Sequence, residues 1–472
     1  MAVPQQPVRR STSSVFTQLR QAVSGAQQDY TSGSIRRAVV LLAVPMILEA
    51  SMESVFALVD IFFIGKLGNA AISAVGLTES VLTMIYSAGM GLSIGGTALI
   101  SRRTGEKKPA EASRTAAQAI LLSFFIAVAL SAAGLIFSRQ ILGFMGAGAE
   151  VISVGLNYTR LIFSSGIFII FLFLINGIFR GAGDASLAMR ALWIANGCNI
   201  ILCPLLIYGI GPWNGLGITG AALATTIGRG VGVCFQLYHL VRGKSVIKIT
   251  GADFIPDKEV LRSFFHVSKT ATLQFMIASA SWAFLARIMA NFGSIAVAGY
   301  TIGIRILVFF ILPAAGLSNA AATLVGQNLG ARQPERAEQS VWTAAKLNMI
   351  FMVGVSLLFF FGSGFLTGFI TNDAEVQRVA TRSLQIIGIG MVFYGVGMVV
   401  TSSFNGAGDT KTPTWINLLW FWAFQIPVAY LLAIVLKLGS NGVFISVITT
   451  ETLITLTAVI IFRKGTWKEM KV

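Results

Sequence analysis

Residues 179–184 read Phe-Arg-Gly-Ala-Gly-Asp, and residues 404–409 read Phe-Asn-Gly-Ala-Gly-Asp, 225 positions further along the chain. The same offset relates Gly-Leu-Ser at 91–93 to Gly-Leu-Ser at 316–318. Further matches at this offset are Ala149-Glu-Val151 with Ala374-Glu-Val376, and Leu99, Gly105 and Pro109 with Leu324, Gly330 and Pro334. One constant offset over separated segments indicates an internal duplication, so we expect a fold of two like halves.

The composition of the chain limits its class. Of 472 residues, 55% are hydrophobic and 11% are charged, and the mean hydropathy is +0.77. A soluble protein carries about 25% charged residues and must expose a large polar surface. A soluble enzyme, a disordered chain and a disulfide-stapled secreted chain are therefore excluded. The net charge of +16 raises nucleic-acid binding as an alternative, which depends on where the charge lies.

Twelve long apolar runs predict membrane-spanning helices. Each has the ~20 residues that a helix needs to cross a hydrocarbon core of ~30 Å, and helices satisfy their own backbone groups in lipid. The predicted spans are 37–64, 71–99, 115–138, 151–178, 186–209, 216–240, 264–290, 294–325, 338–364, 376–404, 412–436 and 440–462. The sequence thus predicts an all-α polytopic membrane protein in two pseudo-symmetric six-helix bundles.

The polar breaks divide the chain into five parts. We expect a polar N-terminal segment at 1–36 without a cleaved signal peptide, a first lobe at 37–240, a linker at 241–263, a second lobe at 264–463 and a tail at 464–472. Because six is even, both lobes run in the same direction and are related by an axis along the membrane normal. Two such bundles facing a central cleft suit alternating access, so the repeat predicts a transporter.

The basic residues predict the orientation. With the N-terminus inside, 26 Lys and Arg side chains fall in cytoplasmic segments and three fall in outer loops. This asymmetry follows the positive-inside rule, which places both termini in the cytoplasm. We therefore expect an integral plasma (inner) membrane protein of a prokaryote with the lipid bilayer as its partner, and no nucleic acid.

The first span carries three acids, Glu49, Glu53 and Asp60, which lie within about 40° of one another on a helix and over about 16 Å of depth. Ionisable groups inside spans are costly and usually functional. A row of this kind facing a wet cavity attracts a cation or holds a proton. The alternative for Glu49 is a solvated position at the cytoplasmic interface.

No motif indicates an enzyme. Cys198, Cys203 and Cys234 all lie in predicted spans, which argues against an extracellular disulfide framework. His239 and His266 stand alone in the sequence, and no nucleophile–base pattern or metal-ligand spacing accompanies them. We expect no enzymatic activity, no cofactor and no metal centre.

Several motifs carry a family resemblance. Pro45-Met-Ile-Leu48, Val59-Asp60 and Gly65-Lys-Leu-Gly68 resemble the first helix of prokaryotic multidrug and toxic compound extrusion (MATE) transporters. Five further segments are also similar to this family: Phe179–Asp184, Phe404–Pro413, Gly326–Gly330, Asn199 with Pro204, and Gly220–Thr225. The resemblance covers nearly the whole chain after residue 35. It implies the fold of the multidrug/oligosaccharidyl-lipid/polysaccharide flippase superfamily, and export of organic cations and drugs in exchange for Na⁺ or H⁺.

The resemblance also implies a cation site at Asp60, Asn199 and Thr225. Position 203 is Cys where many prokaryotic relatives have a second Asp, and Glu53 stands where relatives usually have Gln. A thiol is a poor ligand for Na⁺, since hard cations prefer oxygen. No acid in the seventh or tenth span matches the C-lobe carboxylates of one subfamily. We predict H⁺ coupling through Asp60 with Glu53, and Na⁺ at Asp60, Asn199 and Thr225 as the lesser alternative.

Two further hypotheses concern the gate and the cavity. Glu79 corresponds through the repeat to position 304, next to Arg305, so an ion pair of these two is predicted to close the outer side. The alternative is that each pairs within its own lobe or meets water. Amides in apolar spans either bind substrate or bridge helices, and they are Asn176, Gln274, Asn348, Asn417 and Gln425.

The sequence therefore predicts a secondary active antiporter that exports amphipathic, cationic drugs or metabolites, with a monomer as the default state. The alternative is a flippase of lipid-linked oligosaccharides or other lipids on the same architecture. A pyrophosphate-bearing substrate calls for several Arg or Lys in the central cavity. The acids of the first span favour the antiporter.

Overall fold

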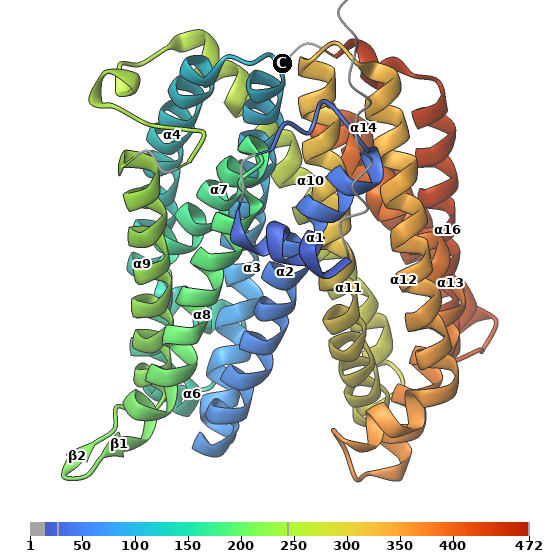
Figure 1. The fold of residues 1–472 in the computed structure, drawn as a ribbon. Helices are drawn as coiled ribbons and strands as arrows, with labels where there is room; N and C mark the ends of the chain where they lie inside the picture. Colours follow the sequence, from blue (N-terminus) through green and yellow to red (C-terminus); the bar gives the residue numbers. More distant parts are fainter. Residues whose placement is uncertain (1–14, 26–27, 243–244, 471–472) are drawn as a thin grey trace, which may run out of the picture.

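The computed structural model describes residues 15–25, 28–242 and 245–470. Within this part of the chain, twelve helices are long and apolar enough to cross a membrane, so the predicted all-α polytopic fold is confirmed. Figure 1 shows the first half in blue to green and the second half in gold to red, side by side. The regular extended structure among these residues is a small antiparallel hairpin of β1 (Gly209–Ile210) and β2 (Trp213–Asn214).

The first half follows the order of the predicted spans. The fourth span is broken at Ser165 into two helices, α6 and α7, which the apolar pattern does not reveal. The helices are α1 (Val15–Ser24), α2 (Ile35–Ile64), η1 (Gly65–Leu67), α3 (Asn69–Gly105), α4 (Pro109–Ile136), α5 (Ser138–Phe144), α6 (Ala149–Ser164), α7 (Gly166–Ala182), α8 (Ala185–Tyr208) and α9 (Ile218–Arg242).

The second half repeats this order after the linker. Its eleventh span is wound partly as π-helix, in η3 and η4, around a short α-helix that begins next to Pro427. The helices are η2 (Gly251–Phe254), α10 (Lys258–Ala290), α11 (Ser294–Gly330), α12 (Pro334–Gly368), α13 (Ala374–Ala407), α14 (Lys411–Asn417), η3 (Leu418–Gln425), α15 (Ile426–Tyr430), η4 (Leu431–Val435), α16 (Ser440–Arg463) and η5 (Thr466–Glu469).

The repeated Gly-Ala-Gly-Asp motif ends a helix in both halves. Gly183 and Gly408 cap α7 and α13 in the left-handed region, with φ of 88° and 89°. The next residue then donates its backbone N–H back to the repeated phenylalanine, at 2.8 Å in the first half and 2.9 Å in the second. Only glycine adopts this φ without strain, so the motif is a duplicated helix stop.

The two halves meet at one end of the bundle. We call the end that holds the linker and the C-terminus the terminal end, and the end that holds β1 and β2 the hairpin end (Figure 1). A Cβ built on Gly91 of α3 would lie 2.5 Å from the backbone nitrogen of Thr272. One on Gly316 of α11 would lie 2.5 Å from that of Ile47. These contacts are equivalent, because positions 47 and 272 are also 225 apart. Away from this end α2 and α11 diverge (Figure 1).

The first helix of each half packs partly into the other half. Buried residues of α2, from Ala38 to Met46, belong to the apolar core built by α11, α12, α13 and α16. Reciprocally, Phe264 and Val267 of α10 belong to the core of the first half. The halves are therefore interlocked at the terminal end by exchanged helix ends.

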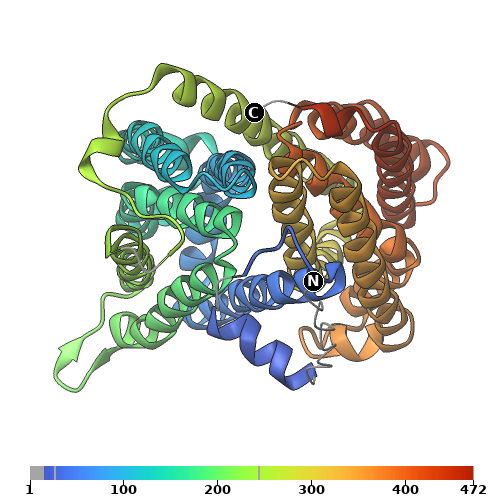
Figure 2. The same ribbon diagram turned by 45° about the horizontal axis from the view of Figure 1, so that its top comes forward.

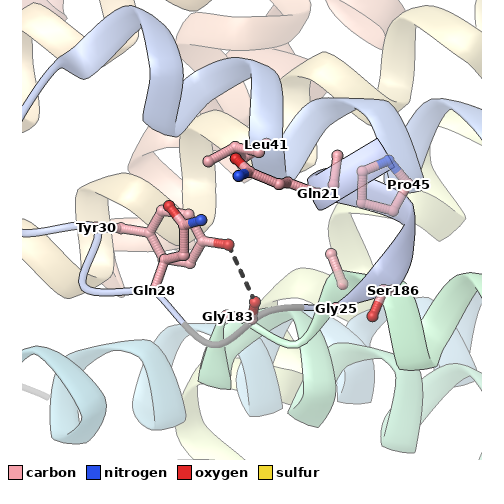
Figure 3. Close-up of a pocket in the computed structure, with 10 residues that line it drawn as sticks. Gln21, Gly25, Gln28, Tyr30, Leu41, Pro45, Gly183 and Ser186 are labelled. Atoms are coloured by element: carbon pink, nitrogen blue, oxygen red, sulfur yellow. Dashed lines mark hydrogen bonds between the residues drawn. The ribbon is translucent and has the colours of Figure 1, made fainter. Parts of the chain in front are cut away.

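The N-terminal segment lies against both halves (Figure 2), and hydrogen bonds join it to each of them. Arg190 of α8 donates to the carbonyls of Val23 and Ser24, both at 2.9 Å, and Arg336 of α12 donates to those of Ser32 and Gly33. Figure 3 shows the small pocket where α1 meets the starts of α2 and α8.

Tyr30 closes that pocket. Its hydroxyl donates to the carbonyl of Gly183 at 3.5 Å, and burial raises the pKa of Tyr30 to about 12. At the other chain end, the buried Trp467 stacks on Phe462 with ring centroids 4.6 Å apart, and Arg102 of α3 donates to the carbonyl of Met470. Both described chain ends therefore tie the first half to the second.

The glycine contacts predict a specific sensitivity. Replacing Gly91 or Gly316 by Val forces backbone against backbone and should cost about 1–3 kcal/mol of stability, as overpacking does. Thermal unfolding of the purified protein, followed by tryptophan fluorescence, measures the effect. Gly354→Val in α12 is the matched control, because a Cβ there meets nothing within 4 Å. Equal unfolding temperatures for all three variants would contradict the close contact.

Candidate functional site

The acidic row of α2 is directed at the other helices of the first half. Glu49 is 5% exposed and lies against α7. One of its oxygens accepts from Asn176 Nδ2 at 2.9 Å and from Arg180 Nη1 at 3.2 Å. Glu49 is therefore a buried, paired carboxylate, and the alternative of a solvated interfacial side chain is wrong.

A polar network extends from this pair. Gln236 of α9 donates to Asn176 Oδ1 at 2.7 Å, and Arg180 Nη2 donates to Ser93 Oγ of α3 at 2.8 Å. The network around the Glu49 carboxylate thus joins four helices, α2, α3, α7 and α9. Asn176 therefore bridges helices, which is the second of the two roles predicted for the amides.

Glu53, one turn further along α2, is paired with a buried arginine. Arg229 Nη2 of α9 lies 3.5 Å from one oxygen of Glu53, and Asn196 Nδ2 of α8 donates to the other at 3.1 Å. The side chain of Arg229 is 3% exposed, donates to Tyr86 Oη at 2.9 Å and lies over the rings of Phe56 and Tyr86. The sequence shows Arg229 inside the sixth span but not its partner.

Asp60 differs from the other two acids. Its carboxylate accepts from the thiol of Cys203 at 3.6 Å, and among the described residues no Lys or Arg nitrogen lies within 4.0 Å of it. One helical turn from Cys203 on α8, Asn199 Nδ2 donates to Thr225 Oγ1 at 3.0 Å. The Oδ1 atom of Asn199 is buried without a partner in the described part of the chain.

The structure thus brings the predicted cation-site residues together in two pairs. Asp60 with Cys203 and Asn199 with Thr225 lie one above the other along α8, since positions four apart share a helix face. Within the described ranges, no group of three or more His, Cys, Asp and Glu side chains is arranged to hold a metal ion.

The predicted gate pair is not formed in this conformation. Glu79 of α3 and Arg305 of α11 both lie in the half of their helix nearer the hairpin end, where α2 and α11 diverge. Among the described residues, neither belongs to an ion pair within 4.0 Å.

A cavity of about 370 Å³ lies between the halves. Gln274 and Asn417, two of the predicted amides, line it, together with Glu451 of α16. The other two differ: Asn348 donates to the carbonyl of Gly395 at 2.8 Å and so bridges α12 and α13, while Gln425 is buried at the end of η3. No sequence signal distinguished Glu451 as part of this cavity.

Twelve spans in two like-oriented halves, with paired charges and a cavity between the halves, define an integral membrane protein built for transport. A family model described as MatE matches residues 45–205 and 271–431, once in each half. The chain belongs to the MatE family, as the sequence motifs predicted.

Relatives match over almost the whole chain. It is 27% identical over 423 residues to the "Probable multidrug resistance protein YoeA" of Bacillus subtilis, covering 89% of this chain and 91% of that protein. It is 26% identical to the "Multidrug export protein MepA" of Staphylococcus aureus, covering 92% and 94%. A solved structure titled "Outward-facing conformation of a multidrug resistance MATE family transporter of the MOP superfamily" matches with a TM-score of 0.86 and 27% identity, covering 92% and 96%.

The Glu49–Arg180 pair predicts a charge-rescue pattern. Glu49→Gln or Arg180→Gln alone leaves one buried charge without its partner and should cost about 3–5 kcal/mol. The double variant removes both charges and should recover most of that loss. Thermal unfolding of the three purified variants tests this, and additive losses in the double variant would show that the two side chains act independently.

Proposed function

We propose that this chain is a secondary active antiporter that exports amphipathic, cationic drugs or metabolites by alternating access, coupled to H⁺ influx through Asp60. The names of its relatives, a probable multidrug resistance protein and a multidrug export protein, support multidrug export. The observation that carries the coupling proposal is the contrast within the row. Glu49 and Glu53 each have an arginine partner, whereas Asp60 has a thiol.

The surroundings of Asp60 favour a proton over Na⁺. A sodium ion needs several hard oxygen ligands, and the group next to Asp60 is the sulfur of Cys203. A proton needs only the carboxylate itself. Binding the proton removes a charge from the interior of the first half, and releasing it restores that charge. Protonation of Asp60 thereby changes the packing of the first half, and this change accompanies the movement of the two halves around the cavity.

The two predicted lobes, residues 37–240 and 264–463, are the moving bodies of this proposal. The closed terminal end and the diverging hairpin end suit a state that is open to the outside (Figure 1). The excess of basic residues on the side of the chain ends supports a cytoplasmic terminal end in a plasma (inner) membrane. The acting unit of the proposal is a monomer.

A flippase for lipid-linked oligosaccharides is not favoured. Its pyrophosphate-bearing substrate calls for free basic groups in the cavity. The basic residue among the described lining residues is Arg180, and its guanidinium is already bound to Glu49 and Ser93.

Transport in proteoliposomes tests the coupling ion. We expect a pH gradient, but not a Na⁺ gradient, to drive accumulation of ethidium by the wild type. Asp60→Asn should reduce it to the level of empty liposomes, because the amide does not exchange a proton. Cys203→Asp adds a second hard ligand and should create a response to Na⁺. Cys203→Ser is its matched control and should remain driven by the pH gradient alone.

Two results would contradict H⁺ coupling. One is accumulation driven by Na⁺ and indifferent to pH in the wild type. The other is undiminished pH-driven accumulation in Asp60→Asn.

The gate hypothesis has its own test. In the proposal, Glu79 and Arg305 pair when the hairpin end closes. Glu79→Arg and Arg305→Glu should each reduce ethidium transport, and the double charge swap should restore it. The gate hypothesis would be contradicted if the double variant retained only the product of the fractions of transport activity that the two single variants retain.

A further inference from the structure

Glu451 is a carboxylate that the proposed coupling does not use. It is the twelfth of the 24 residues of α16, which places it about 17 Å from either end of the helix. Among the described residues, its carboxylate oxygens accept no hydrogen bond and lie within 4.0 Å of no Lys or Arg nitrogen. An unpaired carboxylate at this depth is costly, and such groups mark functional sites.

The walls around Glu451 are aromatic and apolar. Glu451 lines the cavity of about 370 Å³ together with Phe275, Tyr394 and Phe421. A smaller pocket, which Glu451 also lines, includes Trp282 and Met391. Aromatic faces attract cations, and the volume of the cavity lies within the range of about 300–1,000 Å³ that takes drug-sized molecules.

The polar side chains that line the cavity beside Glu451 include neutral amides, among them Gln274, Asn405 and Asn417. The Oε1 atom of Gln274 and the Oδ1 atom of Asn405 are buried without a hydrogen-bond partner in the described part of the chain. The guanidinium of Arg180, on the opposite wall, is neutralised by Glu49. Among the described lining residues the charge left without a partner is therefore the Glu451 carboxylate, which suits a cationic ligand and disfavours an anionic one.

We infer that Glu451 and the cavity before it form the binding site for an organic cation with an aromatic or aliphatic body, whose positive group lies against the carboxylate. The inference rests on the proposed export function and locates its substrate site in the second half. The proton at Asp60 of the first half then occupies a separate site. Proton and substrate are linked through the movement of the halves and do not compete for one carboxylate.

Binding of tetraphenylphosphonium to the purified protein, measured by calorimetry, tests the site. This cation keeps its charge at every pH. Glu451→Gln should weaken its binding at least about tenfold, the effect of losing a charged partner. Glu375→Gln is the matched control, because it removes the same charge from an exposed position at the start of α13 and should leave binding unchanged. Triphenylphosphine oxide, which is neutral, should bind wild type and Glu451→Gln equally.

Asp60→Asn separates this inference from the proposed function. It should lose pH-driven transport and keep tetraphenylphosphonium binding within about threefold of the wild type. Loss of binding in Asp60→Asn, unchanged binding in Glu451→Gln, or no binding by the wild type would each overturn the inference. Wild-type protein that binds the cation through Glu451 but transports nothing would overturn the proposed function instead.

A second readout uses the wild type alone and does not depend on how the variants fold. Dicyclohexylcarbodiimide labels buried carboxyl groups, and peptide mass spectrometry locates the label. Tetraphenylphosphonium should protect Glu451 from labelling, while triphenylphosphine oxide should not. Equal labelling of Glu451 with and without the cation would contradict the site.

Discussion

A charged side chain inside a membrane needs either a partner of opposite charge or a functional role. This constraint divides the acidic residues of the spans into paired and unpaired ones. Glu49 and Glu53 are paired with Arg180 and Arg229, so they hold helices of the first half together. Removing one member of such a pair leaves the other charge buried without compensation, which strongly destabilises the fold. Asp60 and Glu451 have no such partner among the described residues, and we propose that they hold the proton and the substrate.

The second constraint is the close approach of the halves at the terminal end. Gly91 and Gly316 let helix backbones touch, and the first helix of each half enters the core of the other. Small residues at such contacts are the usual means of packing helices in lipid. In the proposed alternating access, opening this end requires both of these equivalent contacts to separate.

The fold could be predicted from the sequence because the apolar runs are long and the internal repeat has one fixed offset. Apolar length predicts a span, and the fixed offset predicts two like halves, each ending its fourth span with the same glycine cap at Gly183 and Gly408. The positions of Glu49, Glu53 and Asp60 on one face followed from helix geometry alone. No such signal shows that the ends of α2 and α10 pack into the opposite half, because an apolar side chain is compatible with either core.

The partners of the acids were harder to foresee. Arg180 lies three residues before the glycine cap and just beyond the predicted span 151–178. The structure instead keeps it within α7 and bonded to Glu49. Arg229 and Glu451 are visible as charges inside spans, but partners on other helices depend on rotation and depth, which hydropathy does not encode. The cavity amides divide for the same reason, with Gln274 facing the cavity and Asn348 bonded to the neighbouring helix.

The central claim is that the substrate and the proton bind at separate, linked sites in different halves. Proton counting tests it most directly: tetraphenylphosphonium is added to purified protein in weakly buffered, Na⁺-free solution, and the change in pH is recorded. The account predicts that binding by the wild type releases protons, and that Asp60→Asn binds the cation but releases none. Binding without proton release by the wild type, or equal release by Asp60→Asn, would contradict it.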